Sequence, residues 1–263
     1  MFRPVFFCLL LSMAGCASIP SGKADPRDPW ERFNRSVFSF NEALDRAIGK
    51  PVAKGYVKVT PRVVRTGISN AFSNLDTVPT IINDALQGKF KQAGHDSARF
   101  LLNSTLGLGG LFDPASAAGL DYNDEDLGQT LGKWGVKAGP YLMLPVLGPS
   151  SLRDGFSRAA DTFLEPVWYL EDDSTRYLIR LGDLLDQRAS LLELDSQLER
   201  SYDKYAFVRN AWLQRREYQV KDGDVEDQSL ELEEEFKDEP EASPAPETNP
   251  APADPAQPAP PPK

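Results

Sequence analysis

Apolar residues recur every three or four positions through most of the chain, which is the spacing of amphipathic helices. The clearest run has apolar positions at Trp30, Phe33, Val37, Phe40, Leu44 and Ile48. Asp28, Pro29 and Glu31 have the spacing of a capping box with proline in the first turn, so we expect a helix to begin there. Gly49 and Pro51 predict that this helix ends at them.

The same period predicts further helices. They are expected over residues 60–75, 77–88, 89–103, 125–134, 152–163 and 174–216, the last as one helix or two. Ser150 and Ser151 are candidate caps for the helix over 152–163. Because no sustained alternation of apolar and polar residues occurs, we expect few or no strands and an all-α fold.

Two Gly/Pro-containing stretches interrupt the helices: FLLNSTLGLGGLFDPASAAG (100–119), which is uncharged from Phe100 to Phe112, and GPYLMLPVLGPS (139–150), which is uncharged throughout. Neither reaches the roughly 18 consecutive apolar residues that a membrane-spanning helix needs. Irregular backbone is tolerated at membrane depth only where it is buried in protein or lines a cavity. The stretches are therefore either buried crossings of a helical core or walls of a path for apolar molecules, and composition alone favours the core.

Between them, Gly128, Gly132 and Gly135 place small residues on one side of a predicted helix. This spacing allows another backbone to approach closely, either in a membrane or in a soluble core.

The N-terminus has the pattern of a secretory signal peptide. Arg3 precedes an apolar run, and the run ends in small residues before Cys16. The sequence Met13-Ala14-Gly15-Cys16 resembles a bacterial lipoprotein box, so we expect cleavage after residue 15, lipidation of Cys16 and a linker over 16–27. An ordinary signal peptide with a chance cysteine is the alternative. Ala17, in place of aspartate, favours sorting to the outer membrane.

The C-terminal 42 residues differ sharply from the rest. Residues 222–263 contain 13 Asp or Glu and 10 Pro but only two Lys, which predicts a disordered acidic tail. Without this tail and the signal peptide, the formal charge of −10 disappears and residues 16–221 are neutral. No basic stripe is present, so we expect no nucleic-acid partner.

No constellation for catalysis, metal or cofactor binding is evident. His95 is the single histidine, and the mature chain would retain only Cys16 as a cysteine. No GxSxG elbow is present, and the GLGG of residues 107–110 lacks the following Lys-Ser/Thr of a phosphate loop. We therefore expect neither enzymatic activity, nor a metal, nor a cofactor.

Several blocks resemble the MlaA/VacJ family. They are DPWERFNRSVFSFNEALD (28–45), NDALQGKF (83–90), RFLLNSTLGLGGLFDPAS (99–116), EDLGQTLGKWGVKAGPYLMLPVLGPSSLRDG (125–155) and SYDKYAFVRNAWLQRREY (201–218). The resemblance covers nearly all of 28–221 in unbroken order, which predicts one helical domain there.

The resemblance implies an outer-membrane lipoprotein of a Gram-negative bacterium. Its fold would be a ring-like bundle of amphipathic helices with Gly/Pro joints around a central amphipathic channel, lying in the inner leaflet of the outer membrane. It would remove phospholipids misplaced in the outer leaflet, pass them to a periplasmic carrier of the Mla type, and bind a trimeric porin.

The resemblance also changes the interpretation of the second stretch. The wall or gate of a lipid path would comprise Gly139, Pro140, Tyr141, Leu142, Met143, Leu144, Pro145, Gly148 and Pro149. Arg153 and Asp154 would be polar partners, either on the head-group side or within the structure. The membrane-facing or helix-packing aromatics would be Trp30, Phe33, Phe38 and Phe40, with Phe38 expected to contact lipid because it lies off the main stripe.

Two other functions remain open. One is a lipid-anchored scaffold with a soluble helical core, in which 139–150 is ordinary core and the protein without Cys16 is soluble. The other is an envelope hydrolase, which would depend on His95.

Overall fold

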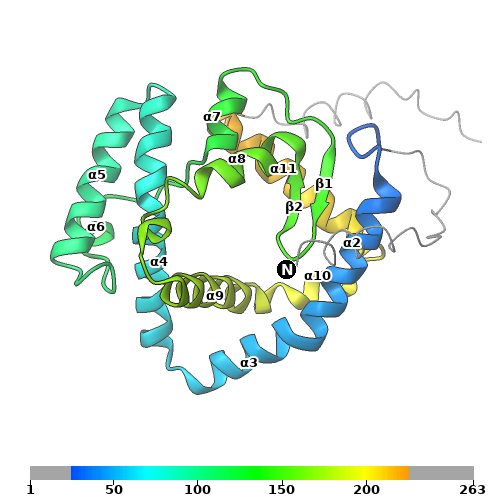
Figure 1. Cartoon of the computed structure of the whole chain (residues 1–263), viewed down its shortest axis with the longest axis horizontal. Coiled ribbons are helices and arrows are strands. Elements are labelled where there is room, and N and C mark those ends of the chain that lie inside the picture. Colours follow the sequence, from blue (N-terminus) through cyan, green and yellow to red (C-terminus); the bar gives the residue numbers. More distant parts are fainter. Residues whose placement is uncertain (1–24, 225–263) are drawn as a thin grey trace, which may run out of the picture. The chain divides into compact units, whose positions relative to one another are not determined.

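The computed structural model describes residues 25–224, which are mostly helical (Figure 1). The helical elements before the single sheet are α2 (Glu31–Leu44), the π-helix η1 (Asp45–Gly49), α3 (Lys50–Val59), α4 (Arg62–Leu86), α5 (Phe90–Thr105), α6 (Pro114–Ala117) and α7 (Leu127–Lys133). The signal peptide, Cys16, the linker up to residue 24 and the tail from residue 225 lie outside the described residues.

A two-stranded antiparallel sheet, β1 (Tyr141–Leu144) and β2 (Gly148–Ser151), occupies the second uncharged stretch. It is followed by α8 (Leu152–Asp161), η2 (Pro166–Tyr169), α9 (Asp173–Ser190), η3 (Leu191–Glu193), α10 (Asp195–Arg200) and α11 (Lys204–Val220). The predicted helix over 174–216 is thus divided into α9, α10 and α11.

The helices and strands of residues 25–224 follow one another around a ring (Figure 1). In that view α3 and α9 lie along one side, α4 borders the next with α5 outside it, and α7, α8, the hairpin and α2 complete the circuit. The fold class is all-α, as the sequence predicts. The hydrophobic cluster lies where α2, the hairpin and α11 meet; its buried members are Val37, Tyr141, Met143 and Tyr205.

The predicted capping box is wrong. α2 begins at Glu31, and its first turn has no side-chain cap. Asp28 instead is buried, where its carboxylate accepts hydrogen bonds from Asn34 Nδ2 at 2.8 Å, from the Tyr205 hydroxyl and from Arg209 Nη1 at 3.1 Å. A carboxylate with three tertiary donors is more stable there than at a helix end, where it would have one.

The helix does not end at Gly49 and Pro51. It continues through the π turn η1 into α3, and the N–H of Lys50 bonds to the carbonyl of Asp45, five residues earlier. Proline has no N–H and its ring collides with the carbonyl four residues before it, so a local widening of the helix accommodates Pro51. The result is the continuous, bent path of α2 and α3 in Figure 1.

The two helices predicted over 60–75 and 77–88 are one. α4 runs without interruption over Arg62–Leu86 with Pro79 inside it. α4 lies against α5 (Figure 1). Tertiary packing therefore outweighs the local cost of the proline.

Candidate functional site

The hairpin at 141–151 has two different faces. Tyr141 and Met143 are each 1% exposed, whereas Leu142 and Leu144, which alternate with them along β1, are half-buried on the other face. This alternation is the period of a strand, and it divides the predicted lipid-path stretch into core residues and accessible ones. The role of the stretch in a lipid path stays a prediction, now centred on the accessible face.

The turn between the strands is apolar and exposed. It consists of Pro145, Val146 and Leu147. Val146 has a φ of 68°, a left-handed conformation that a β-branched residue rarely adopts. Backbone strain of this kind persists only where the surrounding contacts impose it, and it is concentrated at functional sites.

Two asparagines on α2 hold the hairpin. Asn34 donates to the carbonyl of Tyr141 at 3.0 Å and accepts from the N–H of Met143 at 2.9 Å. Asn41 donates to the carbonyl of Leu144 at 2.9 Å and accepts from the N–H of Val146 at 2.8 Å. Of this asparagine pair, Asn34 takes the place of a neighbouring strand along the edge of β1, and Asn41 binds the end of β1 and the turn.

The spacing of the pair fits the strand. Seven residues of an α-helix rise about 10.5 Å. Three residues of a strand advance about 10 Å. The carbonyl that Asn41 binds, that of Leu144, lies three residues after the carbonyl that Asn34 binds, that of Tyr141. One straight helix therefore meets β1 at two points in register.

Beneath the hairpin lies an aromatic cluster. The Tyr141 ring contacts Tyr205 and Trp212 edge-on, with centroids 6.2 and 5.8 Å apart. Phe38 meets Tyr205 in the same way at 5.7 Å. Phe38 is partly buried and packs against the core, whereas Trp30, Phe33 and Phe40 are exposed. The lipid contact expected of Phe38 stays a prediction.

The joints at the two ends of the hairpin are glycines. Gly139, before β1, has a φ of 71°, and Gly148, at the start of β2, has a φ of 79°, both in the region that favours glycine. Pro149 lies opposite Met143 in the ladder. Pro140 is half-buried, and its carbonyl accepts from the N–H of Leu152. The role of Gly139, Gly148 and Pro149 as joints of a lipid path stays a prediction.

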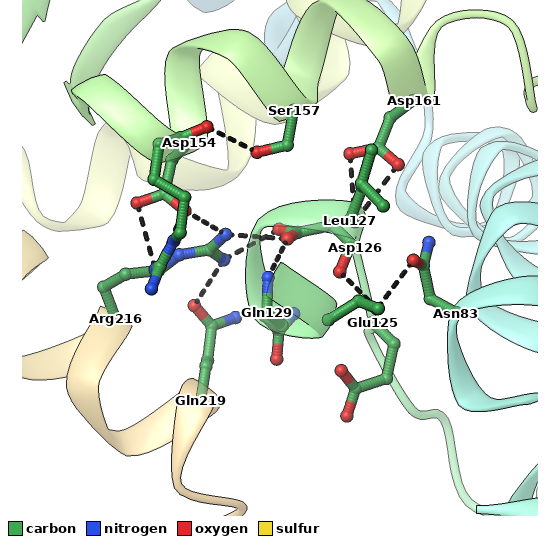
Figure 2. Close-up of polar contacts among 12 residues, drawn as sticks. Asn83, Glu125, Asp126, Leu127, Gln129, Asp154, Ser157, Asp161, Arg216 and Gln219 are labelled. Carbon is green, nitrogen blue, oxygen red and sulfur yellow. Dashed lines mark hydrogen bonds and ion pairs between the residues drawn. The ribbon is translucent and has the colours of Figure 1, made fainter. Parts of the chain in front are cut away.

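Asp154 belongs to a buried ion network (Figure 2), and Arg153 donates to its carboxylate at 3.0 Å. Arg216 donates to Asp154 at 2.8 Å and, through both terminal nitrogens, to Asp126 at 2.7 Å, so α11 is joined to α7 and α8. Ser151 caps α8 and also donates to Asp154. Burial alone would raise the pKa of the Asp154 carboxyl, but the hydrogen bonds and charge of Arg216 hold it below its usual range. In this structure both predicted residues are structural partners.

The predicted glycine face of α7 is occupied by side chains. A Cβ at Gly128 would lie 2.3 Å from both Arg216 Nη2 and Asp154 Oδ1, and one at Gly132 would lie 2.6 Å from Arg153 Nη1. Gly128 and Gly132 therefore make room for the ion network. Gly135 has nothing near it and, with a φ of 89°, follows the end of the helix.

The first uncharged stretch is not a buried crossing. The turn after α5 exposes its apolar residues, Leu106, Leu108, Leu111 and Phe112. Gly110 in this turn lies against α4, because its Cβ would be 2.6 Å from Asn74 Cβ. Among residues 25–224 no helix has the length and apolar character needed to span a bilayer.

Sequence reasoning missed Asn34, Asn41 and Arg216. Two asparagines seven positions apart on a predicted amphipathic helix were the available signal for the pair. His95 lies on α5 with Nδ1 3.5 Å from Asp96 Oδ1. Within the described part of the chain, no group of three or more His, Cys, Asp or Glu could hold a metal ion.

Comparisons with known proteins agree with one another. The model of the family "MlaA lipoprotein" matches residues 26–219. The chain is 35% identical over 221 residues to the "Intermembrane phospholipid transport system lipoprotein MlaA" of Escherichia coli (strain K12), covering 82% of this chain and 87% of that one. It is also 35% identical over 202 residues to an uncharacterized protein of Rickettsia prowazekii (strain Madrid E), covering 76% and 80%.

A solved structure has a similar fold. It is described as "Structural basis for maintenance of bacterial outer membrane lipid asymmetry", with a TM-score of 0.65 and 37% sequence identity. The match covers 73% of this chain and 98% of that chain.

Proposed function

Because this chain belongs to the MlaA lipoprotein family, we propose that it transports phospholipids and maintains the lipid asymmetry of the outer membrane. In this proposal it is an outer-membrane lipoprotein, anchored through Cys16. It takes phospholipids that have reached the outer leaflet and passes them to a periplasmic carrier of the Mla type. The transfer is a movement of intact lipids and involves no covalent chemistry.

One observation carries the proposal: the apolar hairpin has backbone partners on both sides. β2 pairs with one edge of β1, Asn34 binds the other edge, and Asn41 binds the last residue of β1 and the turn. An apolar surface can contact acyl chains only if its backbone N–H and C=O groups are satisfied within the protein. The hairpin meets this condition while leaving Leu142, Leu144 and the turn accessible.

We propose that the accessible face of the hairpin forms part of the wall of an amphipathic channel through the ring. Leu142, Leu144 and Pro145 would contact acyl chains, and Gly139 and Gly148 would act as the joints. Tyr141 and Met143 would support this wall from the core. In Figure 1 the hairpin borders the space that the elements surround.

We further propose that the ring lies in the inner leaflet of the outer membrane beside a trimeric porin. The exposed apolar turn after α5, together with Trp30, Phe33 and Phe40, supports a lipid-facing surface, because soluble proteins rarely expose so many large apolar side chains.

A deletion strain tests the function directly. Without the protein, phospholipid should accumulate in the outer leaflet of the outer membrane, and expression of the full chain should remove it. The measurement is labelling of outer-leaflet phospholipid in whole cells. An unchanged outer leaflet in the deletion strain would overturn the proposal.

A further inference from the structure

A second site lies away from the hairpin, where α5 begins and α11 ends. A cavity of about 810 Å³ opens there, lined by the start of α5, the segment before α7 and the last turns of α11. Its volume is within the range of small-molecule sites, roughly 300–1,000 Å³. Most of the residues that line it are polar or charged.

Two opposite charges in this cavity lack direct partners. Arg215 is exposed and forms no hydrogen bond or ion pair with the other residues of the range 25–224. The Asp124 carboxylate likewise accepts no hydrogen bond among these residues. The two attract each other without forming an ion pair. A guanidinium and a carboxylate are thus both available to a ligand.

The electrostatic surroundings of Asp124 favour a cationic ligand. Burial raises the pKa of the Asp124 carboxyl, and the negative charge of Asp126 adds to this, while Arg215 and Arg216 lower it. Since no side chain of residues 25–224 donates to this carboxylate, a cation placed beside it would stabilise its charged form.

The remaining walls complete a site for a small zwitterion. Tyr122 and Tyr218 line the cavity. The Arg99 guanidinium already lies over the Tyr122 ring, 5.7 Å from its centroid, so the exposed Tyr218 is the ring that would attract an ammonium group. Lys89, also in the wall, is already bound by Glu125 and Asp222, which leaves Arg215 as the open cation. Because the cavity wall contains carboxylates as well as cations, it is unsuitable for a purely anionic ligand.

We propose that this cavity binds a phosphodiester joined to a primary ammonium, the head-group chemistry of phosphatidylethanolamine, with Arg215 on the phosphate and Asp124 on the ammonium. This inference rests on the proposed function and adds a head-group preference to it. Arg215 can bind two phosphate oxygens through its planar guanidinium, and Asp124 distinguishes an ammonium-bearing head group from an uncharged one.

Binding of short-chain lipids to the purified full chain in a non-ionic detergent tests the proposal. The probes are dihexanoyl phosphatidylethanolamine, dihexanoyl phosphatidylglycerol and glycerophosphoethanolamine, measured by isothermal titration calorimetry. We expect the ethanolamine lipid to bind about fivefold or more tightly than the glycerol lipid. Asp124→Asn should abolish this preference. Arg215→Gln should lower the affinity for both lipids by about tenfold.

Two matched variants are the controls. Asp121→Asn changes an exposed aspartate of the same segment outside the cavity, and Arg32→Gln changes an exposed arginine on α2. Both should bind like the native protein. Tighter binding of the dihexanoyl lipid than of glycerophosphoethanolamine would identify a membrane lipid as the source of the ligand, and equal binding would identify the free head group; either result supports the site.

Absence of binding, or affinities that neither Asp124→Asn nor Arg215→Gln changes, would overturn the inference. The proposed function is decided separately, because it depends on outer-leaflet phospholipid in the deletion strain. If the Arg215→Gln and Asp124→Asn proteins bind lipids as the native protein does and also rescue the deletion strain, the proposed transport function stands. The cavity then has no part in that function.

Discussion

Met143 and Leu144 are neighbours in the sequence, but their side chains lie on opposite faces of β1. Met143 is packed in the core with Tyr205, whereas Leu144 is accessible. The same chemical change at the two positions therefore has different consequences. This pair separates an effect on folding from an effect on lipid transport.

Leu144→Asp should leave the protein abundant and impair transport, because its carboxylate can stay hydrated while it repels acyl chains. Met143→Asp should deplete the protein, since an unpaired buried carboxylate costs several kcal/mol. Immunoblotting of membranes and outer-leaflet labelling measure the two effects. Degradation of the Leu144→Asp protein, with full activity for Leu144→Ala, would assign this face to the core.

A pair of buried carboxyl groups joins α4 to α5. Asp84 and Asp96 are 0% and 1% exposed, and the amide of Asn123 donates weakly to both, at 3.4 and 3.3 Å. Burial and a hydrogen bond with Asp96 raise the pKa of Asp84 from 3.8 to about 7, the charge of Glu125 adds to this, and Lys89 opposes it. The folded protein thus holds a proton that the unfolded chain releases at lower pH.

Stability should therefore fall as pH rises from about 4 to about 7, the interval between the unfolded and folded pKa values of Asp84. Asp84→Asn mimics the protonated carboxyl and should increase the free energy of unfolding at pH 8 by about 1–2 kcal/mol, with a smaller gain at pH 5. Denaturant unfolding at both pH values measures this, with Asp121→Asn as control. If Asp84→Asn changed the free energy of unfolding equally at both pH values, the folded protein would not be holding the extra proton on Asp84.

At the scale of elements, the crossing of α7 with α8 and α11 depends on the absence of one side chain. Gly128→Ala should place a Cβ within the Arg216–Asp154 contact, so the ion network must separate, at a cost of about 3 kcal/mol. Gly155→Ala in α8, whose new Cβ would lie 3.6 Å from Ser150 Oγ, should be neutral or stabilising by up to about 1 kcal/mol. Thermal unfolding compares the two. Equal melting temperatures would show that α7 moves aside easily.

The helical elements were predictable because their apolar period is local. Ser151 caps α8 as predicted, since its side chain and the N–H that it binds are three residues apart. The end expected at Gly49 and Pro51 and the break expected between residues 75 and 77 were wrong, because packing against other helices decided them. Local signals identify where helices are favoured but not where tertiary contacts extend them.

The hairpin and its partners were beyond local signals. Asn34 and Tyr141 are 107 positions apart, so nothing near either residue indicates that one binds the other. The same holds for Arg216 and Asp126, 90 positions apart. The stretch 139–150 was identified as unusual from its composition, but its division into a buried and an accessible face required the strand geometry.

At the scale of the whole molecule, the exposed apolar surface predicts membrane association that does not depend on the lipid anchor. Cys16→Ala should abolish lipidation, yet the protein should still require detergent, because Leu106, Leu108 and Phe112 stay exposed. Detergent phase partitioning of the purified variant measures this. Replacing these three residues with serine in the Cys16→Ala protein should move it into the aqueous phase.

A Cys16→Ala protein that is monodisperse without detergent would contradict this prediction. It would instead support the lipid-anchored scaffold, whose soluble core needs no membrane surface.

The asparagine pair also limits how the hairpin can move. A slide of β1 by one residue, about 3.3 Å, would misalign both amides at once and turn Tyr141 and Met143 away from the core. Partial displacements therefore gain nothing, since they lose the contacts of one register without forming those of another. We therefore expect the hairpin to leave α2 only as a whole, with release of Asn34 and release of Asn41 as a single cooperative event.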